Sequence, residues 1–166
     1  MTWVAATAGL AVFGTIAAVS LGSAAAEEHA AQEVSLVEDF AYPGAEQIRR
    51  RDDVRLISGD GHILYVDDKD CGTPRPEFIT VYTTDQIGRG GEGVVCFRVT
   101  GPSGHLTLEL PAVFEIHSGG RKGHADVSTG SGERASVDLR TVGSTQVGVG
   151  VAGGEPATLL RLEITP

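Results

Sequence analysis

Four histidines stand near the ends of expected β-strands, where side chains from separate strands can meet at one rim of a sheet. They are His62, His105, His117 and His124. Imidazole changes its charge near neutral pH, so two or three gathered rings can bind a metal ion or act as a general base. The alternative is that the rings are scattered and solvated. We expect His62 and His105 to form one pair, and His117 and His124 a second.

Carboxylates cluster on both sides of the expected strand at 62–66. Asp60 precedes this strand, and Asp67, Asp68 and Asp70 follow it. Carboxylate oxygens are the hard ligands that calcium prefers, although the spacing is not that of an EF-hand loop. Lys69 stands within the run, which favours the competing interpretation of a solvated acidic turn. A structural calcium ion on these four aspartates is one hypothesis, and no other cofactor is expected.

The strings that identify common enzyme classes are missing or out of context. Glycines 88, 90 and 93 have the G-x-G-x-x-G spacing, but that fingerprint needs a helix after it, and residues 94–99 have the pattern of a strand. We therefore expect a hairpin loop there. G-x-S-x-G, H-E-x-x-H and P-loop strings do not occur, so no residue is assigned a catalytic role.

Aromatic rings are few, and the only Trp is Trp3. Alternation puts Tyr82 on the same face as Phe78, which favours a place in the core. Tyr42 and Tyr65 remain to present a ring to solvent, and an exposed ring of this kind can stack against a sugar. The candidate binding residues are therefore Tyr42, Tyr65, His62 and His105.

From residue 54 onward, short β-branched runs alternate with clusters of Gly, Pro, Ser and Asp, which is the pattern of an all-β domain. The expected strands are 54–57, 62–66, 78–83, 94–100, 105–110, 113–117, 125–128, 135–140, 146–151 and 157–164. Leu106, Leu108 and Leu110 share one face of their strand, as in a half-buried antiparallel sheet. Asp60-Gly61 predicts a hairpin between the first two strands, and residues 130–132 predict another.

One short helix is expected at 43–51, because Pro43 suits a first helical turn and good helix formers follow it. The bases at 49–51 suit the helix dipole and are balanced by Asp52 and Asp53, so we interpret them as a helix end. Regular strands with a single helix predict an antiparallel β-sandwich, jelly-roll-like or immunoglobulin-like, over residues 40–166.

The first 26 residues carry no charged side chain and end in small residues, which is typical of a cleaved signal peptide. An uncleaved membrane anchor is the alternative, because the apolar run reaches about 18 residues. Residues 27–39 form an acidic linker, which holds five of the carboxylates and no base. We therefore expect a secreted, extracellular protein that is free of the membrane after cleavage.

The sequence has two cysteines, Cys71 and Cys96. An even pair in an exported protein usually forms a disulfide, and closing this loop stabilises the fold by about 3 kcal/mol in the chain-entropy model. Two ligands of a metal site are the alternative, but no further Cys or His stands at ligand spacing.

A formal charge of −9 with only two lysines excludes a sequence-independent nucleic-acid binder, which needs a basic face. A rigid extracellular domain without a catalytic motif favours a non-enzymatic module that binds a cell-envelope or extracellular glycan or a protein. The alternatives are a hydrolase or hydrolase accessory domain with rim His and Asp residues, and a structural extracellular protein that associates through a sheet edge.

Several stretches of the chain resemble one group of proteins. Residues 42–48, 59–63, 96–101, 106–111 and 157–162 are similar to small secreted actinobacterial proteins of unassigned function. The resemblance implies export, and it carries over no catalytic or binding residue.

Overall fold

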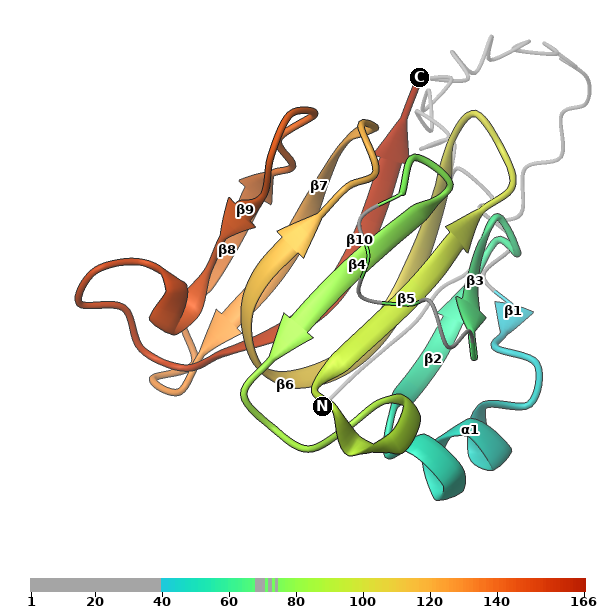
Figure 1. Cartoon of the computed structure of the whole chain (residues 1–166), viewed down its shortest axis with the longest axis horizontal. Coiled ribbons are helices and arrows are strands. Elements are labelled where there is room, and N and C mark those ends of the chain that lie inside the picture. Colours follow the sequence, from blue (N-terminus) through green and yellow to red (C-terminus); the bar gives the residue numbers. More distant parts are fainter. Residues whose placement is uncertain (1–39, 68–70, 72, 74) are drawn as a thin grey trace, which may run out of the picture. The chain divides into compact units, whose positions relative to one another are not determined.

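A computed structural model describes residues 40–166, apart from 68–70, 72 and 74. The expected signal peptide and acidic linker therefore lie outside the described residues. The elements, shown in Figure 1, are β1 (Phe40–Ala41), α1 (Ala45–Asp52), β2 (Arg55–Gly59), β3 (Ile63–Val66), β4 (Phe78–Thr83), the 3-10 turn η1 (Arg89–Gly91), β5 (Val94–Val99), β6 (Gly104–His117), β7 (Lys122–Thr129), β8 (Arg134–Asp138), β9 (Thr145–Gln146), the 3-10 turn η2 (Gly148–Gly150) and β10 (Ala157–Thr165).

The fold is an all-β, sandwich-like arrangement in which the named strands pair antiparallel, as the sequence predicts. Strand β6 belongs to two layers. Its first half pairs with β2 and β10, and its second half pairs with β4 and β9. One layer therefore contains β2, β6, β10, β7 and β8, and the other contains β3, β5, β4 and the end of β6.

Strand β6 changes layer at a bend, which is visible as its strong curve in Figure 1. Ala112 has a φ of 52°, a left-handed value that is uncommon for a residue with a side chain. The sequence suggests two strands here, because Pro111 interrupts the pattern. That expectation is wrong, since strands that switch layers do so at bends of this kind without breaking.

The core lies between the two layers. Leu106, Leu108 and Leu110 are fully buried on one side, as their alternation predicts, and Ile79 and Phe97 are fully buried on the other. Burying a side chain of this size contributes about 1.5–3 kcal/mol. The single helix of the described chain, α1, has eight residues, and none of the described helices is long and apolar enough to cross a membrane.

The disulfide lies on the outer face of the second layer. Cys71 and Cys96 are bonded, with their Cα atoms 5.8 Å apart, which confirms the expected pairing. Cys96 belongs to β5, and its neighbour on β4, Thr80, is fully buried beside it. The bridge therefore fastens Cys71 over the middle of this sheet.

Of the two turns predicted from the sequence, one is wrong and one is confirmed. Residues 60–61 do not form a hairpin, because β2 pairs with β6 while β3 pairs with β5, so the chain crosses between layers here. The hairpin at 130–132 is confirmed by the pairing of β7 with β8.

Several elements have bounds that differ from the prediction, and two of these differences have a clear local cause. The helix begins at Ala45 instead of Pro43, because Gly44 before it is left-handed with a φ of 70°. The expected strand at 146–151 ends after Gln146 and gives way to η2, where Gly148 is left-handed. Val147 is buried in the core, whereas Val149 and Val151 are exposed, so their alternation does not mark a strand.

A buried carboxylate joins α1 to the second layer. Asp52 ends the helix with 4 % of its side chain exposed, and it accepts hydrogen bonds from the Arg51 guanidinium at 2.7 and 2.9 Å and from the Tyr65 hydroxyl at 2.8 Å. Burial alone would raise the pKa of Asp52, but these bonds and the charges of Arg51 and Arg89 outweigh it and lower that pKa. Burial, and then the hydrogen bond to Asp52, raises the pKa of Tyr65.

We expect Asp52→Asn to lower the free energy of unfolding by about 2 kcal/mol at pH 7, because hydrogen bonds to a charged group are lost. A carboxyl with a lowered pKa stabilises the fold above its ordinary value of 3.8 and loses that contribution as the pH falls through its folded pKa. The difference between wild type and variant should therefore be largest at pH 5–7 and shrink below about pH 4. Urea unfolding at several pH values measures it, and a difference independent of pH would contradict the assignment.

Candidate functional site

Asp60 brings the first predicted pair of histidines together. Its Oδ2 atom lies 3.4 Å from Nδ1 of His105 and 3.6 Å from Nδ1 of His62. The two rings differ in access, because half of the His62 side chain is exposed and only 9 % of that of His105. One carboxylate therefore lies between an open imidazole and a buried one.

The backbone holds this carboxylate in place. Asp60 accepts a hydrogen bond from the backbone N–H of His62 at 3.0 Å and from that of His105 at 3.1 Å. The segments that carry His62 and Gly104 lie so close together that a Cβ on Gly104 would be 2.7 Å from Cβ of His62. This position therefore requires glycine. Asp60 thus braces the crossing between β2 and β3 against the start of β6.

Pairing across the strands extends the polar group over the outer face of the first layer. His105 on β6 lies opposite Glu163 on β10, which in turn lies opposite His124 on β7. His124 Nε2 is 3.4 Å from Glu163 Oε2, and Arg161 Nη2 is also 3.4 Å from that oxygen. We name Asp60, His105, Arg161, Glu163 and His124 the polar row.

A bulge in β10 places Arg161 in this row. Leu159 is in the core, and the register shifts before Arg161, so that Leu160 and Arg161 both lie outside the core. An extra residue in one strand re-aims the side chains that follow it. Strict alternation would instead have pointed Arg161 and Leu159 to the same side.

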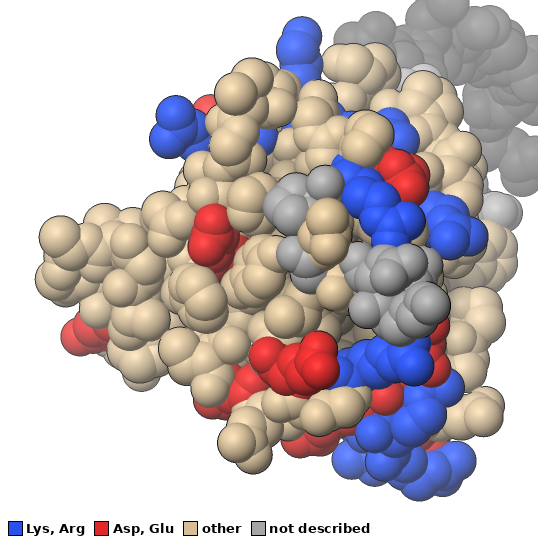
Figure 2. All heavy atoms as spheres, viewed as in Figure 1, with Lys and Arg blue, Asp and Glu red and all other residues tan. Residues whose placement is uncertain are grey.

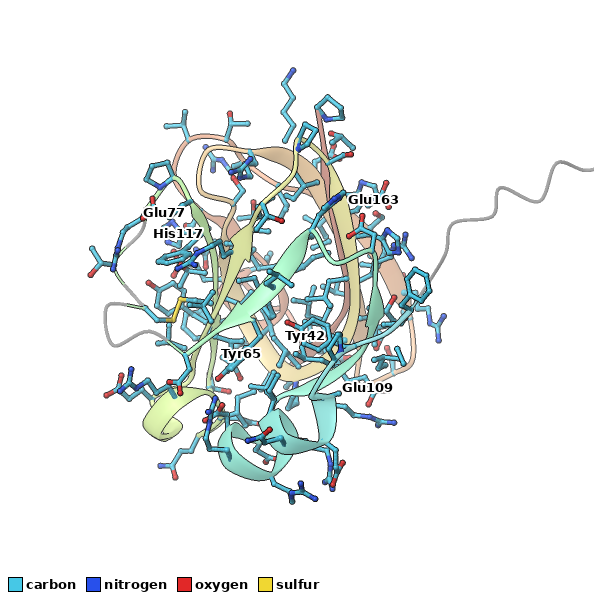
Figure 3. The ribbon with its side chains drawn as sticks, turned by 90° about the vertical axis from the view of Figure 1, so that its right-hand side faces the viewer. Tyr42, Tyr65, Glu77, Glu109, His117 and Glu163 are labelled. Atoms are coloured by element: carbon cyan, nitrogen blue, oxygen red, sulfur yellow. A yellow bond between two sulfur atoms is a disulfide. The ribbon has the colours of Figure 1, made fainter. Side chains whose placement is uncertain are left out.

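Two adjoining hollows lie along the polar row and share Arg161. The smaller has a volume of about 190 Å³ and includes Asp60, His105 and Glu163. The larger has a volume of about 420 Å³ and includes Asp126 and Arg134. Figure 3 labels Glu163 at the margin of the domain, on the side away from His117.

The groups around the hollows suit a ligand rich in hydroxyl groups. An ionised carboxylate only accepts hydrogen bonds and a guanidinium only donates them, whereas a hydroxyl does both. Glu163 and Arg161 stand side by side, so neighbouring hydroxyls of one molecule can bond to both. Their side chains are about one-third exposed, which leaves them open to such a ligand.

Two of the four aspartates that could bind calcium make other contacts in the structure. Asp60 accepts backbone N–H groups, and Asp67 pairs with Arg51 at 3.2 Å and with Arg89 at 3.3 Å. Asp68 and Asp70 lie outside the described residues. Within the described part of the chain, no group of three or more His, Cys, Asp or Glu side chains is placed to hold a metal ion. Calcium at this loop stays a prediction.

The predicted aromatic pair lies differently from the expectation. Tyr42 and Tyr65 are half-buried and pack against the core, near the middle of the view in Figure 3. The Tyr42 hydroxyl accepts the backbone N–H of Tyr65 at 2.7 Å, and the Tyr65 ring meets Phe97 edge to face. These contacts join strands, and they leave neither ring as a flat, open platform.

The second predicted histidine pair is separated by the fold. His117 lies at the end of β6 opposite Thr80, with its Nε2 atom 3.0 Å from Oε1 of Glu115. His124 instead takes Glu163 as its neighbour on the other layer. The two histidines are close in sequence, but they lie on either side of the turn between β6 and β7. Their rings therefore have different partners.

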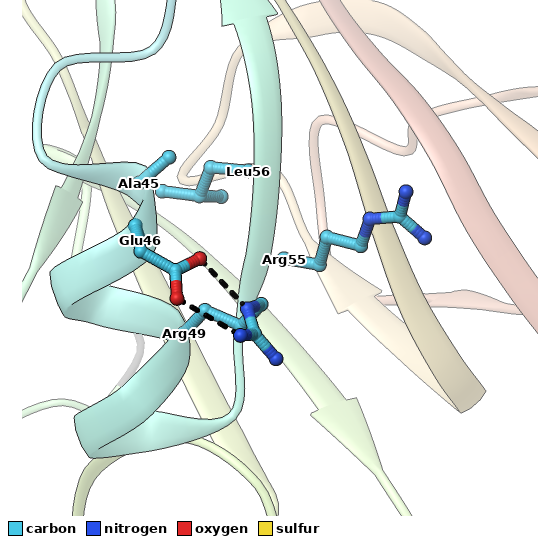
Figure 4. Close-up of a pocket in the computed structure, with 5 residues that line it drawn as sticks. All are labelled: Ala45, Glu46, Arg49, Arg55 and Leu56. Carbon is cyan, nitrogen blue, oxygen red and sulfur yellow. Dashed lines mark hydrogen bonds and ion pairs between the residues drawn. The ribbon is translucent and has the colours of Figure 1, made fainter.

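A further hollow of about 430 Å³ lies between α1 and β2 (Figure 4). Basic side chains gather at the corner of the domain where α1 lies, as Figure 2 shows, and they include Arg49 and Arg50. Glu46 pairs with both of these, while Arg55 points away and pairs with Glu109. Exposed pairs of this kind contribute little energy, and the arginines here already have carboxylate partners, so we place no site here.

Glu163 and Arg161 are the site residues that sequence reasoning missed. Both stand in the expected strand at 157–164, where their charges are consistent with an ordinary solvated face. The informative signal is the pairing of Glu163 with two histidines on different strands, and strand register is not visible in a single sequence.

No protein-family model matches this chain, and a search of curated proteins finds no match. The function therefore has to be inferred from the chemistry of the described residues. The polar row is the strongest candidate, because its members come from four segments that are far apart in the sequence.

We expect Asp60→Ala to lower the free energy of unfolding by about 2 kcal/mol, because two backbone N–H groups lose a charged acceptor. Asp138→Ala is the matched control. It removes an exposed carboxylate from the same layer and should change stability by less than about 0.5 kcal/mol. Denaturant unfolding of both variants measures the effect, and equal losses would show that Asp60 is not a brace.

Proposed function

We propose that this chain is an exported, non-enzymatic β-sandwich protein that binds a glycan of the cell envelope or extracellular matrix. The observation that carries the proposal is the polar row, with its carboxylates, guanidinium and imidazoles around two adjoining hollows. A binding module needs a rigid scaffold and a contact surface. The outer face of β6, β10 and β7 provides both.

Binding fits the geometry better than catalysis does. A general base must reach the proton that it removes. Asp60 already accepts two backbone N–H groups, and His105 beside it is buried. The approach of His62 and His105 to one carboxylate still favours a hydrolase as the second candidate, in which the exposed His62 would act as the base.

Export is supported by the disulfide, because such bonds form and persist mainly in oxidising compartments. It is supported further by the uncharged, apolar start of the sequence. Both features favour a protein that is exported from the cytoplasm.

Expression of the full chain in an exporting bacterial host should release a protein whose mass matches residues 27–166 less two hydrogens. Intact mass spectrometry of the supernatant, with and without reduction and alkylation, measures both cleavage and oxidation. A full-length mass in the membrane fraction would instead indicate a retained anchor, and two free thiols would contradict the oxidised state.

The glycan proposal is tested by binding to purified bacterial cell walls and to a panel of insoluble polysaccharides. Arg161→Ala and Glu163→Gln should each weaken binding about tenfold, because each removes hydrogen bonds to a charged group. Arg50→Ala is the control, since it removes an exposed arginine on α1, and it should bind as wild type does.

Three results would overturn this assignment. Equal binding by all variants would exclude the polar row, and an absence of binding to every polymer would exclude the glycan. A release of new reducing ends that His62→Ala abolishes would establish the hydrolase instead.

A further inference from the structure

The outer face of the second layer carries three rings that the polar row does not use. Tyr82 on β4 has its ring centroid 6.3 Å from that of Phe114 and 5.7 Å from that of His117, which it meets edge to face. All three side chains are half-buried, so each keeps part of its surface open. We name Tyr82, Phe114 and His117 the ring cluster.

A bulge in β6 creates this cluster. Tyr82 lies opposite Glu115 and Thr83 lies opposite Val113, so Phe114 is the extra residue between them. Val113 and Ile116 are fully buried in the core, while both residues between them are half-buried. A bulge turns neighbouring side chains to one side of a strand. Phe114 and Glu115 therefore both lie on the outer face.

A hollow of about 430 Å³ adjoins the cluster at His117. Arg75 and Thr141 line it together with the backbone of Gly119, where a Cβ would lie 2.4 Å from the carbonyl oxygen of Phe78. In Figure 3, His117 and Glu77 are labelled on one side of the domain and Glu163 on the other. The hollow is thus separate from the polar row.

We propose that the ring cluster and this hollow form a second binding site, which holds one sugar ring by stacking. The C–H face of a pyranose is apolar and packs on an aromatic ring, whereas its hydroxyls need polar partners at the edge. Glu115 beside His117 supplies an acceptor, and Arg75 and Thr141 supply donors. The inference shares the ligand class of the proposed function, but it rests on different residues in the other layer.

Protonation of the cluster is consistent with this role. Burial, and then the charge of Glu115, raises the pKa of Tyr82 above its ordinary value of 10.0. A tyrosine hydroxyl is already protonated at neutral pH at that ordinary value, and the shift keeps it so to higher pH.

The test is NMR of the domain with isotope-labelled Tyr and His rings. The probes are soluble hexamers of β-1,4-linked glucose and of β-1,4-linked N-acetylglucosamine. We expect the resonances of Tyr82 and His117 to shift on titration, while those of the core-packed Tyr42 and Tyr65 stay unchanged. Phe114→Ala should weaken this response about tenfold.

Phe40→Ala is the matched control, because Phe40 is 61 % exposed on β1 and belongs to no ring cluster among the described residues. It should respond as wild type does. Thermal melting of each variant checks that it folds. If Phe114→Ala does not fold, the shifts of the Tyr82 and His117 resonances in the wild type still test the proposal.

The same spectra separate the two sites. Shifts confined to His62, His105 and His124 would overturn the ring cluster as a site and leave the polar row standing. Shifts confined to Tyr82 and His117 would support the cluster and contradict binding at the polar row. A Phe114→Ala response equal to that of Phe40→Ala would also overturn the proposal, as would an absence of shifts at every ring.

Discussion

The structure depends on one strand that serves two layers. Strand β6 must keep Leu106, Leu108 and Leu110 in the core, then bend, and then return Val113 and Ile116 to the same core. The left-handed Ala112 and the bulge at Phe114 meet this demand. Because a compact core leaves few voids, the bend and the bulge have to occur where the two layers meet.

Both candidate sites follow from this constraint. The first half of β6 contributes His105 to the polar row, and the second half contributes Phe114 and His117 to the ring cluster. Each of these residues is next to, or one residue away from, a fully buried apolar side chain. The core contacts therefore hold the outward-facing groups on a rigid strand, and a site on a rigid element keeps its geometry better than one on a loop.

Local patterns in the sequence predicted much of the fold. Alternation located most strands and the buried Leu106, and an even cysteine count paired Cys71 with Cys96. The same reasoning failed wherever a bulge or a bend breaks the period of two, as at Pro111 and at the start of η2. It also failed for the turn at 60–61, because the partner of a strand depends on distant residues.

The candidate sites were predicted to different extents, because contacts between distant segments are not visible in local sequence patterns. Asp60 lies between His62 and His105, which the sequence expected to pair, because strand ends meet at the rim of a layer. Tyr82 was assigned to the core from the face of β4 that it shares with Phe78. That face is the outer one, where two arginines bury Phe78 and Tyr82 is only half-buried. Alternation assigns a side chain to a face, but whether another segment covers that face is a tertiary property. At one end of β4 the guanidinium groups of Arg75 and Arg98 cover the ring of Phe78, whereas Tyr82 near the other end keeps part of its surface open.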